Sequence, residues 1–384
     1  MRSARIALCS AALLMSSFAF PVMAQDATPV AESGVTPIAT GLTNPRGFTW
    51  GDDGTLYVAL AGTGGEIPGT IDGAEIGVFG GPSSSVVTVD NGCATPLVEG
   101  IPSGNWRDAS WIWGAHDVAF LDGQLYVLSA GGGIDFGNPD QPSGILRVEN
   151  DGTATVVADF STWSLTNPPA FVSPDYNPSG SLFDMEAGAD RLWVSDAVGG
   201  RIITVTPDGV INLVADISDG HPVPTGLAAA PDGGVYVGNL TAIPFTDGSA
   251  KVIHVSPDGA VTDFWTGLTA INDIAIGPDG MLYAVEMATG NLTEPPFVTT
   301  GTGRVVRMAG PGLSAPVITG IDFPAYISFG ADGALYLTTP GFSPDDGVGH
   351  GSLLRIDLTV GVPVPLAGLE AIAPTCPDAG TPKA

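Results

Sequence analysis

The chain has 384 residues, of which 40 are acidic and 12 basic, and its formal net charge is −28. Such acidity argues against nucleic acid and anionic membranes as partners and favours cations, glycans or neutral small molecules, although solubility alone would also account for it. A hydrophobic content of 44% is enough to build a core, and 54 glycines and 33 prolines are typical of strands joined by turns.

The first 24 residues have the pattern of an export signal. Residues 1–5 carry two arginines, residues 6–20 are apolar, and Ala24 provides the small residue that signal peptidase prefers. A retained membrane anchor is the weaker alternative, because the apolar run is shorter than the ~20 residues that span a bilayer. We therefore expect cleavage before Gln25, a polar tether over residues 25–35, and a secreted or extracytoplasmic protein without a membrane anchor.

Six copies of one pattern follow over residues 36–358. In each copy a short apolar run leads through a tight turn, usually Asp-Gly, into a hydrophobic-aromatic-hydrophobic triplet. The triplets are anchored at Leu56, Leu125, Leu192, Val235, Leu282 and Leu335, which lie 69, 67, 43, 47 and 53 residues apart. Asp-Gly pairs supply the positive φ angles of tight hairpins, and repeats of roughly 40–50 residues with several strands are typical of propeller blades. The sequence predicts an all-β, six-bladed β-propeller with four-stranded antiparallel blades.

The N-terminal strand should close the ring. The sixth copy lacks a fourth strand, and residues 37–42 match the fourth strands at residues 96–101 and 316–321. Pairing of these ends would remove an open sheet edge. Residues 359–384 remain as a Pro-rich tail, and we predict a monomer.

Long connections are expected on only one end of the ring. They are the second-to-third-strand loops at residues 61–84, 131–142, 240–250, 287–303 and 339–351, and the links between blades at residues 103–115 and 162–181. The first link holds three candidate ligand contacts, Trp106, Trp111 and Trp113. Long loops confined to one face of a regular fold indicate a functional face. Packing of the loops is an equally good explanation for these aromatic residues.

The same end should hold the starts of the innermost strands. Aligned copies place Gly47, Asp117, Asp184, Gly226, Asp273 and Tyr326 at one position. Arg46, His116 and Asn272 directly precede the first, second and fifth of these. The second strands should end in the same direction with Asp196, Asn239 and Glu286. Three converging carboxylates suit Ca²⁺ or Mg²⁺, with Arg46, His116, Asn272 and Tyr326 as ligand contacts. Alternatively, the aspartates cap backbone N–H groups where the strands enter the ring.

Two cysteines remain after removal of the signal, Cys93 in the first blade and Cys376 in the tail. Exported proteins retain disulfides, and the first and last blades of a ring are neighbours. We expect a Cys93–Cys376 bridge that pins the tail, with two free thiols as the alternative.

The chain resembles the ScyD/ScyE-type family of secreted propellers. The resemblance rests on residues 38–47 (IATGLTNPRG), 53–59 (DGTLYVA) and 62–65 (GTGG), and it extends over essentially the whole mature chain. Residues 193–202 are also similar to NHL repeats. The six-bladed gluconolactonase-like enzymes share the architecture, but their metal motif is not cleanly present. Quinone-dependent sugar dehydrogenases start with a similar strand, yet they need more basic and His contacts than this chain offers.

No familiar catalytic motif is present, such as Gly-x-Ser-x-Gly or His-Glu-x-x-His. We therefore expect a secreted binding or scaffold protein that engages a small molecule, a glycan or an extracellular protein on its long-loop face. The alternative is a metal-dependent hydrolase or lactonase in the central channel, with Asp117, Asp184 and Asp273 as ligands and His116 or one aspartate as base.

Overall fold

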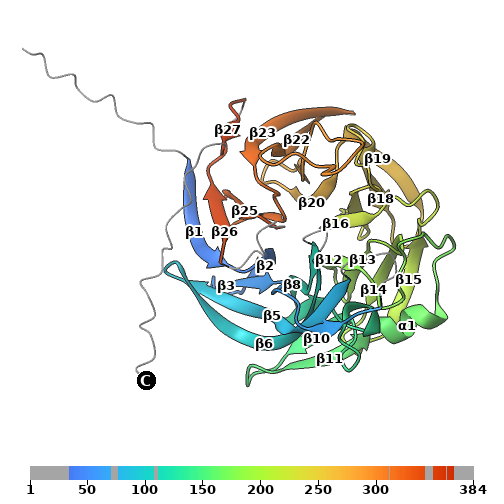
Figure 1. The fold of residues 1–384 in the computed structure, drawn as a ribbon. Helices are drawn as coiled ribbons and strands as arrows, with labels where there is room; N and C mark the ends of the chain where they lie inside the picture. Colours follow the sequence, from blue (N-terminus) through green and yellow to red (C-terminus); the bar gives the residue numbers. More distant parts are fainter. Residues whose placement is uncertain are drawn as a thin grey trace, which may run out of the picture. The chain divides into compact units, whose positions relative to one another are not determined.

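The computed structural model describes residues 34–70, 77–107, 111–310, 312–341, 349–359 and 361–366. The chain divides into two units, Met1–Glu32 and Ser33–Ala384, and every described residue belongs to the second. This unit contains six sheets arranged as blades around one axis (Figure 1). The predicted six-bladed propeller is confirmed, whereas the predicted export signal lies outside the described residues.

Each blade has four main strands, listed here from the innermost outward. Blade 1 contains β2 (Pro45–Trp50), β3 (Leu56–Leu60), β5 (Val78–Asp90) and β6 (Cys93–Trp106), with β4 (Ile67–Pro68) and β7 (Trp111–Trp113) added. Blade 2 contains β8 (Ala115–Leu121), β9 (Gln124–Ser129), β10 (Gly144–Val148) and β11 (Ala154–Asp159). Blade 3 contains β12 (Leu182–Ala187), β13 (Leu192–Asp196), β14 (Arg201–Val205) and β15 (Ile211–Asp216).

The second half of the ring repeats this order. Blade 4 contains β16 (Pro224–Ala229), β17 (Val235–Asn239), β18 (Ala250–Val255) and β19 (Val261–Leu268). Blade 5 contains β20 (Ile271–Ile276), β21 (Leu282–Glu286), β22 (Gly303–Gly310), β23 (Leu313–Ile321) and the added β27 (Val364–Pro365). Blade 6 contains β24 (Ile327–Phe329), β25 (Leu335–Thr339), β26 (Gly351–Ile356) and β1 (Val35–Leu42).

The repeated Asp-Gly pairs form the expected turns between the first and second strands. Gly54, Gly233, Gly280 and Gly333 have φ angles between 74° and 86°, a region that glycine enters without steric cost. We call the end of the ring formed by these turns the turn face, and the opposite end the long-loop face.

The N-terminal strand closes the ring as predicted. β1 pairs antiparallel with β26, with Ala39 opposite Leu353. Both side chains are fully buried. The last blade is therefore built from both ends of the described chain, which covers its outer edge.

The described part of the tail lies against blade 5. It includes β27, which pairs in parallel with the outer strand of blade 5, Ile318 opposite Val364. An outer strand offers unpaired backbone groups, and this short pairing uses them. Cys376 lies outside the described residues, whereas Cys93 is disulfide-bonded; the proposed pairing of the two stays a prediction.

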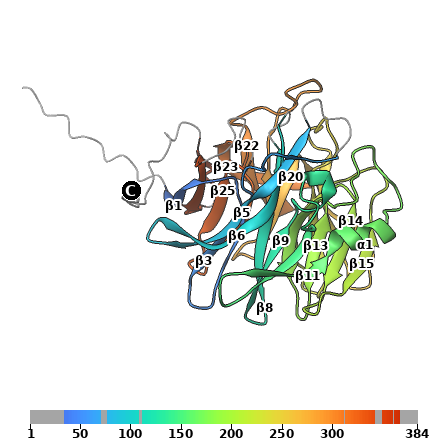
Figure 2. The same cartoon turned by 60° about the horizontal axis from the view of Figure 1, so that its bottom comes forward.

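The connections of blade 1 are more ordered than the sequence suggests. Residues expected in long loops extend β5 to 13 and β6 to 14 residues, a hairpin that reaches beyond the other strands of the blade (Figure 2). Two short helices were also missed, α1 (Phe160–Thr166) and the 3-10 turn η1 (Ile134–Phe136). Both are too short for a helical hydrophobic pattern, and α1 depends on Asp159, whose side chain caps the N–H of Thr162 at 2.8 Å.

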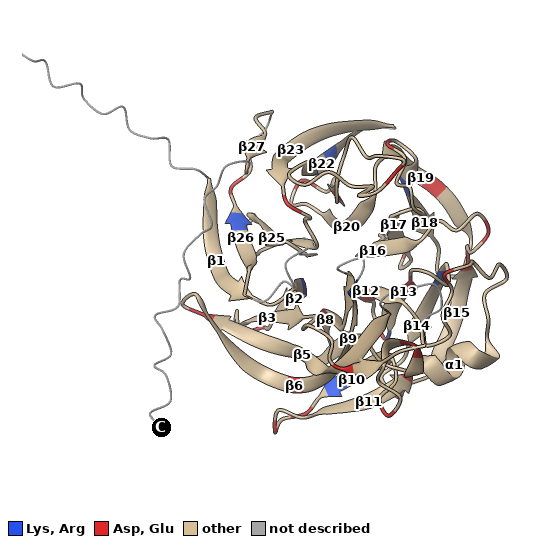
Figure 3. Cartoon of the chain, viewed as in Figure 1, with Lys and Arg blue, Asp and Glu red and all other residues tan. Residues whose placement is uncertain are grey.

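The hydrophobic cores lie between neighbouring blades. Between blades 3 and 4, for example, Trp193 and Ile202 pack with Val235 and Val237, all at most 4% exposed. Acidic residues occur around the whole ring rather than on one side (Figure 3). No helix in the described part of the chain is long and apolar enough to cross a membrane.

Candidate ligand cavity on the propeller axis

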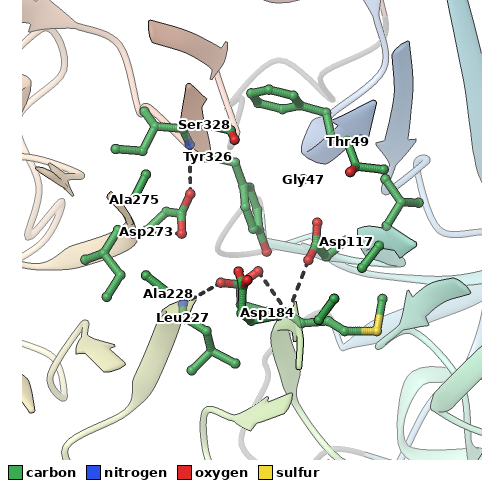
Figure 4. Close-up of a pocket in the computed structure, with 18 of the residues that line it drawn as sticks. Gly47, Thr49, Asp117, Asp184, Leu227, Ala228, Asp273, Ala275, Tyr326 and Ser328 are labelled. Atoms are coloured by element: carbon green, nitrogen blue, oxygen red, sulfur yellow. Dashed lines mark hydrogen bonds between the residues drawn. The ribbon is translucent and has the colours of Figure 1, made fainter. Parts of the chain in front are cut away.

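The innermost strands share a pairing irregularity near their starts. In blades 1 to 5 the register between the first and second strands shifts at this point, for example between Leu182 and Met185 in blade 3. A bulge of this kind re-aims one side chain out of the sheet. The re-aimed positions are the ones that the sequence alignment matched, Gly47, Asp117, Asp184, Gly226 and Asp273, with Tyr326 in blade 6. Gly47, the three aspartates and Tyr326 come together around the axis (Figure 4), and Gly226 lies beside Asp273.

The three aspartates join neighbouring blades through backbone N–H groups. Asp184 accepts from its own neighbour Met185 at 2.9 Å and from Leu227 of blade 4 at 2.5 Å. Asp273 accepts from Ile274 and from Ile327 of blade 6, both at 2.7 Å. Asp117 completes the set by accepting from Met185 of blade 3 at 3.2 Å. The capping role that the sequence left open is therefore present in all three.

The two glycines at this level make room for the carboxyls. A Cβ atom on Gly47 would lie 1.8 Å from Oδ1 of Asp117, and one on Gly226 would lie 2.5 Å from Oδ1 of Asp273. Any side chain at either position would displace an aspartate. Blades 1 and 4 therefore have glycine at this position because the aspartates of blades 2 and 5 occupy the space that a side chain would need.

Tyr326 crosses the axis above the aspartates. Its hydroxyl donates to the carbonyl oxygen of Phe183 at 2.5 Å, and its ring stacks on Phe183 with centroids 6.0 Å apart. The contact joins blade 6 to blade 3 across the ring. It also separates the aspartates from the long-loop face.

The side chains that directly precede the aligned positions lie on the long-loop side of the aspartates and are buried. Arg46, His116 and Asn272 are at most 3% exposed. Arg46 donates to the carbonyls of Gly341 and Ile112, and Asn272 donates to that of Pro324 at 2.7 Å. Burial lowers the pKa of Arg46 to about 10, and burial together with Arg46 lowers the pKa of His116 to about 3. Hydrogen bonds from Arg46 and Asn272 to these carbonyls cover the long-loop side of the aspartates.

A cavity of about 400 Å³ lies on the other side of the aspartates, towards the turn face. Asp117, Asp184, Asp273 and Tyr326 form its floor. Two residues further along each innermost strand, the wall contains Thr49, Ala119, Glu186, Ala228, Ala275 and Ser328. The volume lies within the range of about 300–1,000 Å³ typical of small-molecule sites. Glu186 is the one ionisable side chain of this wall layer.

Sequence reasoning missed Glu186, although a signal was present. The equivalent position is Thr, Ala or Ser in the other five copies of the repeat. A carboxyl among small residues at a position that alternation places beside Asp184 would have pointed to the axis. No group of the described chain forms a hydrogen bond or ion pair with the Glu186 carboxyl.

The acidic side chains that line the cavity have raised pKa values. Burial, reinforced by the nearby Asp184 carboxyl, raises the pKa of both Asp117 and Asp273 well above the usual aspartate value. Burial also raises the pKa of Asp184. Burial and Asp184 together raise the pKa of Glu186 to about 8. The aspartates of the floor therefore bind protons more tightly than free aspartates do, and Glu186 can lose its proton near pH 8.

The aspartates do not fit the metal site expected from the sequence. Five of their six carboxylate oxygens accept the backbone N–H bonds described above. Across the described residues, no three His, Cys, Asp or Glu side chains are grouped so as to hold a metal ion. No reaction step through Ca²⁺ or Mg²⁺ is derived from them.

The three predicted tryptophans lie on the long-loop extension of blade 1. Trp106 and Trp113 stack with ring centroids 6.4 Å apart, and Trp113 contacts Phe136 of the blade 2 loop at 5.0 Å. Trp111 packs against the apolar cluster above the axis. Packing of the loops, the alternative left open by the sequence, accounts for these contacts.

The acidic residues that end the second strands of blades 3 and 5 have ion-pair or hydrogen-bond partners of their own. Asp196 pairs with Arg201 at 2.6 Å, both buried, and Glu286 accepts from the N–H of Thr269 at 2.7 Å. Neither lines the axial cavity. The idea that they point to the channel with the aspartates is wrong.

No protein-family model and no curated protein matches the sequence. The structure is similar to that of a putative oxidoreductase (glucose dehydrogenase) from Thermus thermophilus, with TM-score 0.53 and 16% identity over 84% of this chain and 99% of that chain. It is also similar to a gluconolactonase from Xanthomonas campestris, with TM-score 0.51 and 15% identity over 85% of this chain and 89% of that one. At such identities the likeness establishes the six-bladed propeller fold alone.

Proposed function

We propose that this chain is an exported binding protein whose axial cavity takes up a small molecule bearing an ammonium or similar cationic group. The observation that carries the proposal is the Glu186 carboxyl, which has no hydrogen-bond or ion-pair partner among the described residues. It lies in a wall of small side chains on the turn-face side of three buried aspartates. The net charge of −28 favours the approach of cations to the molecule. The predicted export signal and the resemblance to the ScyD/ScyE-type secreted propellers support an extracytoplasmic role.

Binding of a cation should be coupled to release of a proton. Glu186 is mostly protonated below its pKa of about 8. An ammonium group within contact distance favours the carboxylate, so each binding event would release up to one proton. Linkage then predicts that affinity rises by up to about tenfold per pH unit below pH 8.

Titration calorimetry with pentylamine tests the proposal. In two buffers of different ionisation enthalpy, the wild type should show proton release at pH 7, and Glu186→Gln should lose the release and at least tenfold in affinity. Glu99→Gln, on an exposed strand of blade 1, is the matched control and should behave as the wild type. Equal binding by Glu186→Gln and the wild type, or no binding by either, would overturn the proposal.

A second candidate places a protein partner on the long-loop face. Large apolar side chains are exposed in five connections on that face, at Ile67, Ile134, Phe171, Val172, Ile243 and Leu292, each at least 42% exposed. A contiguous apolar patch is typical of an interaction surface, so this candidate requires these side chains to act as one patch. The double variant Ile243→Ser with Leu292→Ser should then keep the melting temperature and lose a partner recovered with the wild type from the extracellular fraction. Recovery of the same partner by both proteins would exclude this surface.

A further inference from the structure

A second hollow of about 380 Å³ lies beside the axial cavity, between blades 3 and 4 on the turn face. Its walls come from the first turns of both blades and from β13, β14 and β15. The lining includes Gly188, Ala189, Trp193, Thr204, Val214 and Gly234. Ala187 and Ala229 line both this groove and the axial cavity, so the two spaces adjoin.

The strand register connects the two spaces. Glu186 of β12 lies opposite Trp193 of β13, and Trp193 lies opposite Thr204 of β14. Residues opposite one another in adjacent strands share a face of the sheet. Neighbouring strands lie about 4.8 Å apart, so the row from Glu186 to Thr204 extends about 10 Å outward, measured along the backbones, into the groove.

Small residues keep the groove open. Four alanines and three glycines line it, and a Cβ atom on Gly234 would lie 2.2 Å from the carbonyl oxygen of Val255. The floor includes Trp193, whose side chain packs into the core between the blades and is 4% exposed. The outer rim carries the Asp190–Arg191 ion pair, at 2.7 Å and exposed. A mainly apolar groove that runs from the acidic axial cavity at Glu186 to the Asp190–Arg191 pair at its rim suits an elongated, amphipathic molecule.

We infer that the axial cavity and the groove between blades 3 and 4 form one elongated site for an amine whose cationic head meets Glu186 and whose apolar or aromatic body fills the groove. The inference rests on the proposed function, since the head group occupies the same cavity. It adds the class of ligand, an alkyl or aryl amine with a body long enough to pass Ala187 and Ala229.

The test compares two probes, pentylamine and dansylcadaverine, which carries the same primary amine on a five-carbon chain with an aromatic group at its far end. Wild-type protein should bind dansylcadaverine at least tenfold more tightly than pentylamine, with a blue shift of the dansyl fluorescence. Val214→Phe and Ala189→Trp fill the groove away from the axial cavity. Each should lose the tenfold advantage and the blue shift and keep the affinity for pentylamine.

Val210→Phe is the matched control, because Val210 is 50% exposed in the neighbouring turn and lies outside the groove lining. It should retain both affinities and the blue shift. Retention of the dansyl advantage in both groove variants, or equal affinities of the two probes in the wild type, would overturn the elongated site while leaving the axial cavity. Unchanged pentylamine binding in Glu186→Gln, or no binding of either probe, would overturn the proposed function and this inference with it.

Discussion

Asp273 of blade 5 accepts a hydrogen bond at 2.7 Å from the backbone N–H of Ile327 in blade 6. The same relationship links Asp117 to Met185 and Asp184 to Leu227, so a buried carboxyl joins three of the six pairs of neighbouring blades. In the remaining pairs, glycine or Tyr326 occupies the equivalent position. The ring is therefore held near its axis by polar bonds as well as by the apolar cores between blades.

Removal of the Asp273 carboxyl should destabilise the propeller. Asp273→Ala leaves two buried N–H groups without a partner, at a cost of about 1–3 kcal/mol each. Asp273→Asn keeps one acceptor oxygen and leaves only one of the two N–H groups without a partner, so it should cost about half as much as Asp273→Ala. Urea unfolding measures both, with Asp52→Ala in an exposed turn as control. Equal losses for Ala and Asn would show that the accepted hydrogen bonds are not the cause.

The acids of the cavity predict a stability that falls as pH rises. The folded-state pKa of Glu186 is about 8, above the ordinary 4.5, so the folded protein binds this proton more tightly than the unfolded chain. The stabilisation is complete below about pH 4.5 and is lost as pH rises to about 8. Thermal melts of the wild type and Glu186→Gln should therefore converge or cross with rising pH, with the wild type losing more.

The pKa shift of His116 has the opposite effect on the pH dependence of stability. Its contribution must be separated from that of Glu186. The pKa of His116 is lowered to about 3 from 6.5, so stability is lost as pH falls below about 6.5. The wild type and Glu186→Gln both contain His116, so the difference between their melting temperatures at one pH removes this contribution. A difference between the two melting temperatures that does not change between pH 5 and pH 8 would contradict the raised pKa of Glu186.

The repeat predicted the ring, its closure by β1 and the convergence of Asp117, Asp184 and Asp273. Turn chemistry and strand alternation are local, so they can be recognised in one sequence. The face on which the aspartates become accessible could not be predicted. It depends on hydrogen bonds from Arg46 and Asn272 to backbone carbonyls that come from distant parts of the chain. Likewise, the groove exists only because blades 3 and 4 meet with small residues on both sides.

Arg201 should be among the most important charged residues for stability. Its guanidinium is fully buried, pairs with Asp196 at 2.6 Å and lies 5.2 Å from the ring centroid of Phe160. Arg201→Met leaves Asp196 as a buried unpaired charge, which typically costs about 3–5 kcal/mol. Arg147→Met removes a partly exposed pair with Glu149 and should cost less than about 1 kcal/mol. Chemical unfolding compares the two, and similar losses would contradict the special role of Arg201.

Divalent cations should leave the thermal stability unchanged. A bound ion would stabilise the folded state by mass action, but most of the aspartate oxygens on the axis already accept N–H bonds. Melting of untagged protein with millimolar Ca²⁺ or Mg²⁺, and with a chelator, should give the same temperature. A clear increase with either ion that disappears in Asp184→Asn would restore the metal-dependent hydrolase as the leading function.

The last prediction concerns the disulfide of Cys93, which begins β6 in blade 1. The chain has three cysteines, and Cys9 falls in the predicted export signal, so Cys376 is the expected partner in the exported protein. The bridge would close a loop of 376 − 93 = 283 residues. In the chain-entropy model such a loop stabilises the folded state by about 5 kcal/mol, and measured gains are often smaller. Peptide mapping without reduction should recover the Cys93 and Cys376 peptides linked, and reduction should lower the melting temperature. Cys93→Ser should melt at the reduced temperature with or without reductant. Two titratable thiols in the exported wild type would refute the pairing.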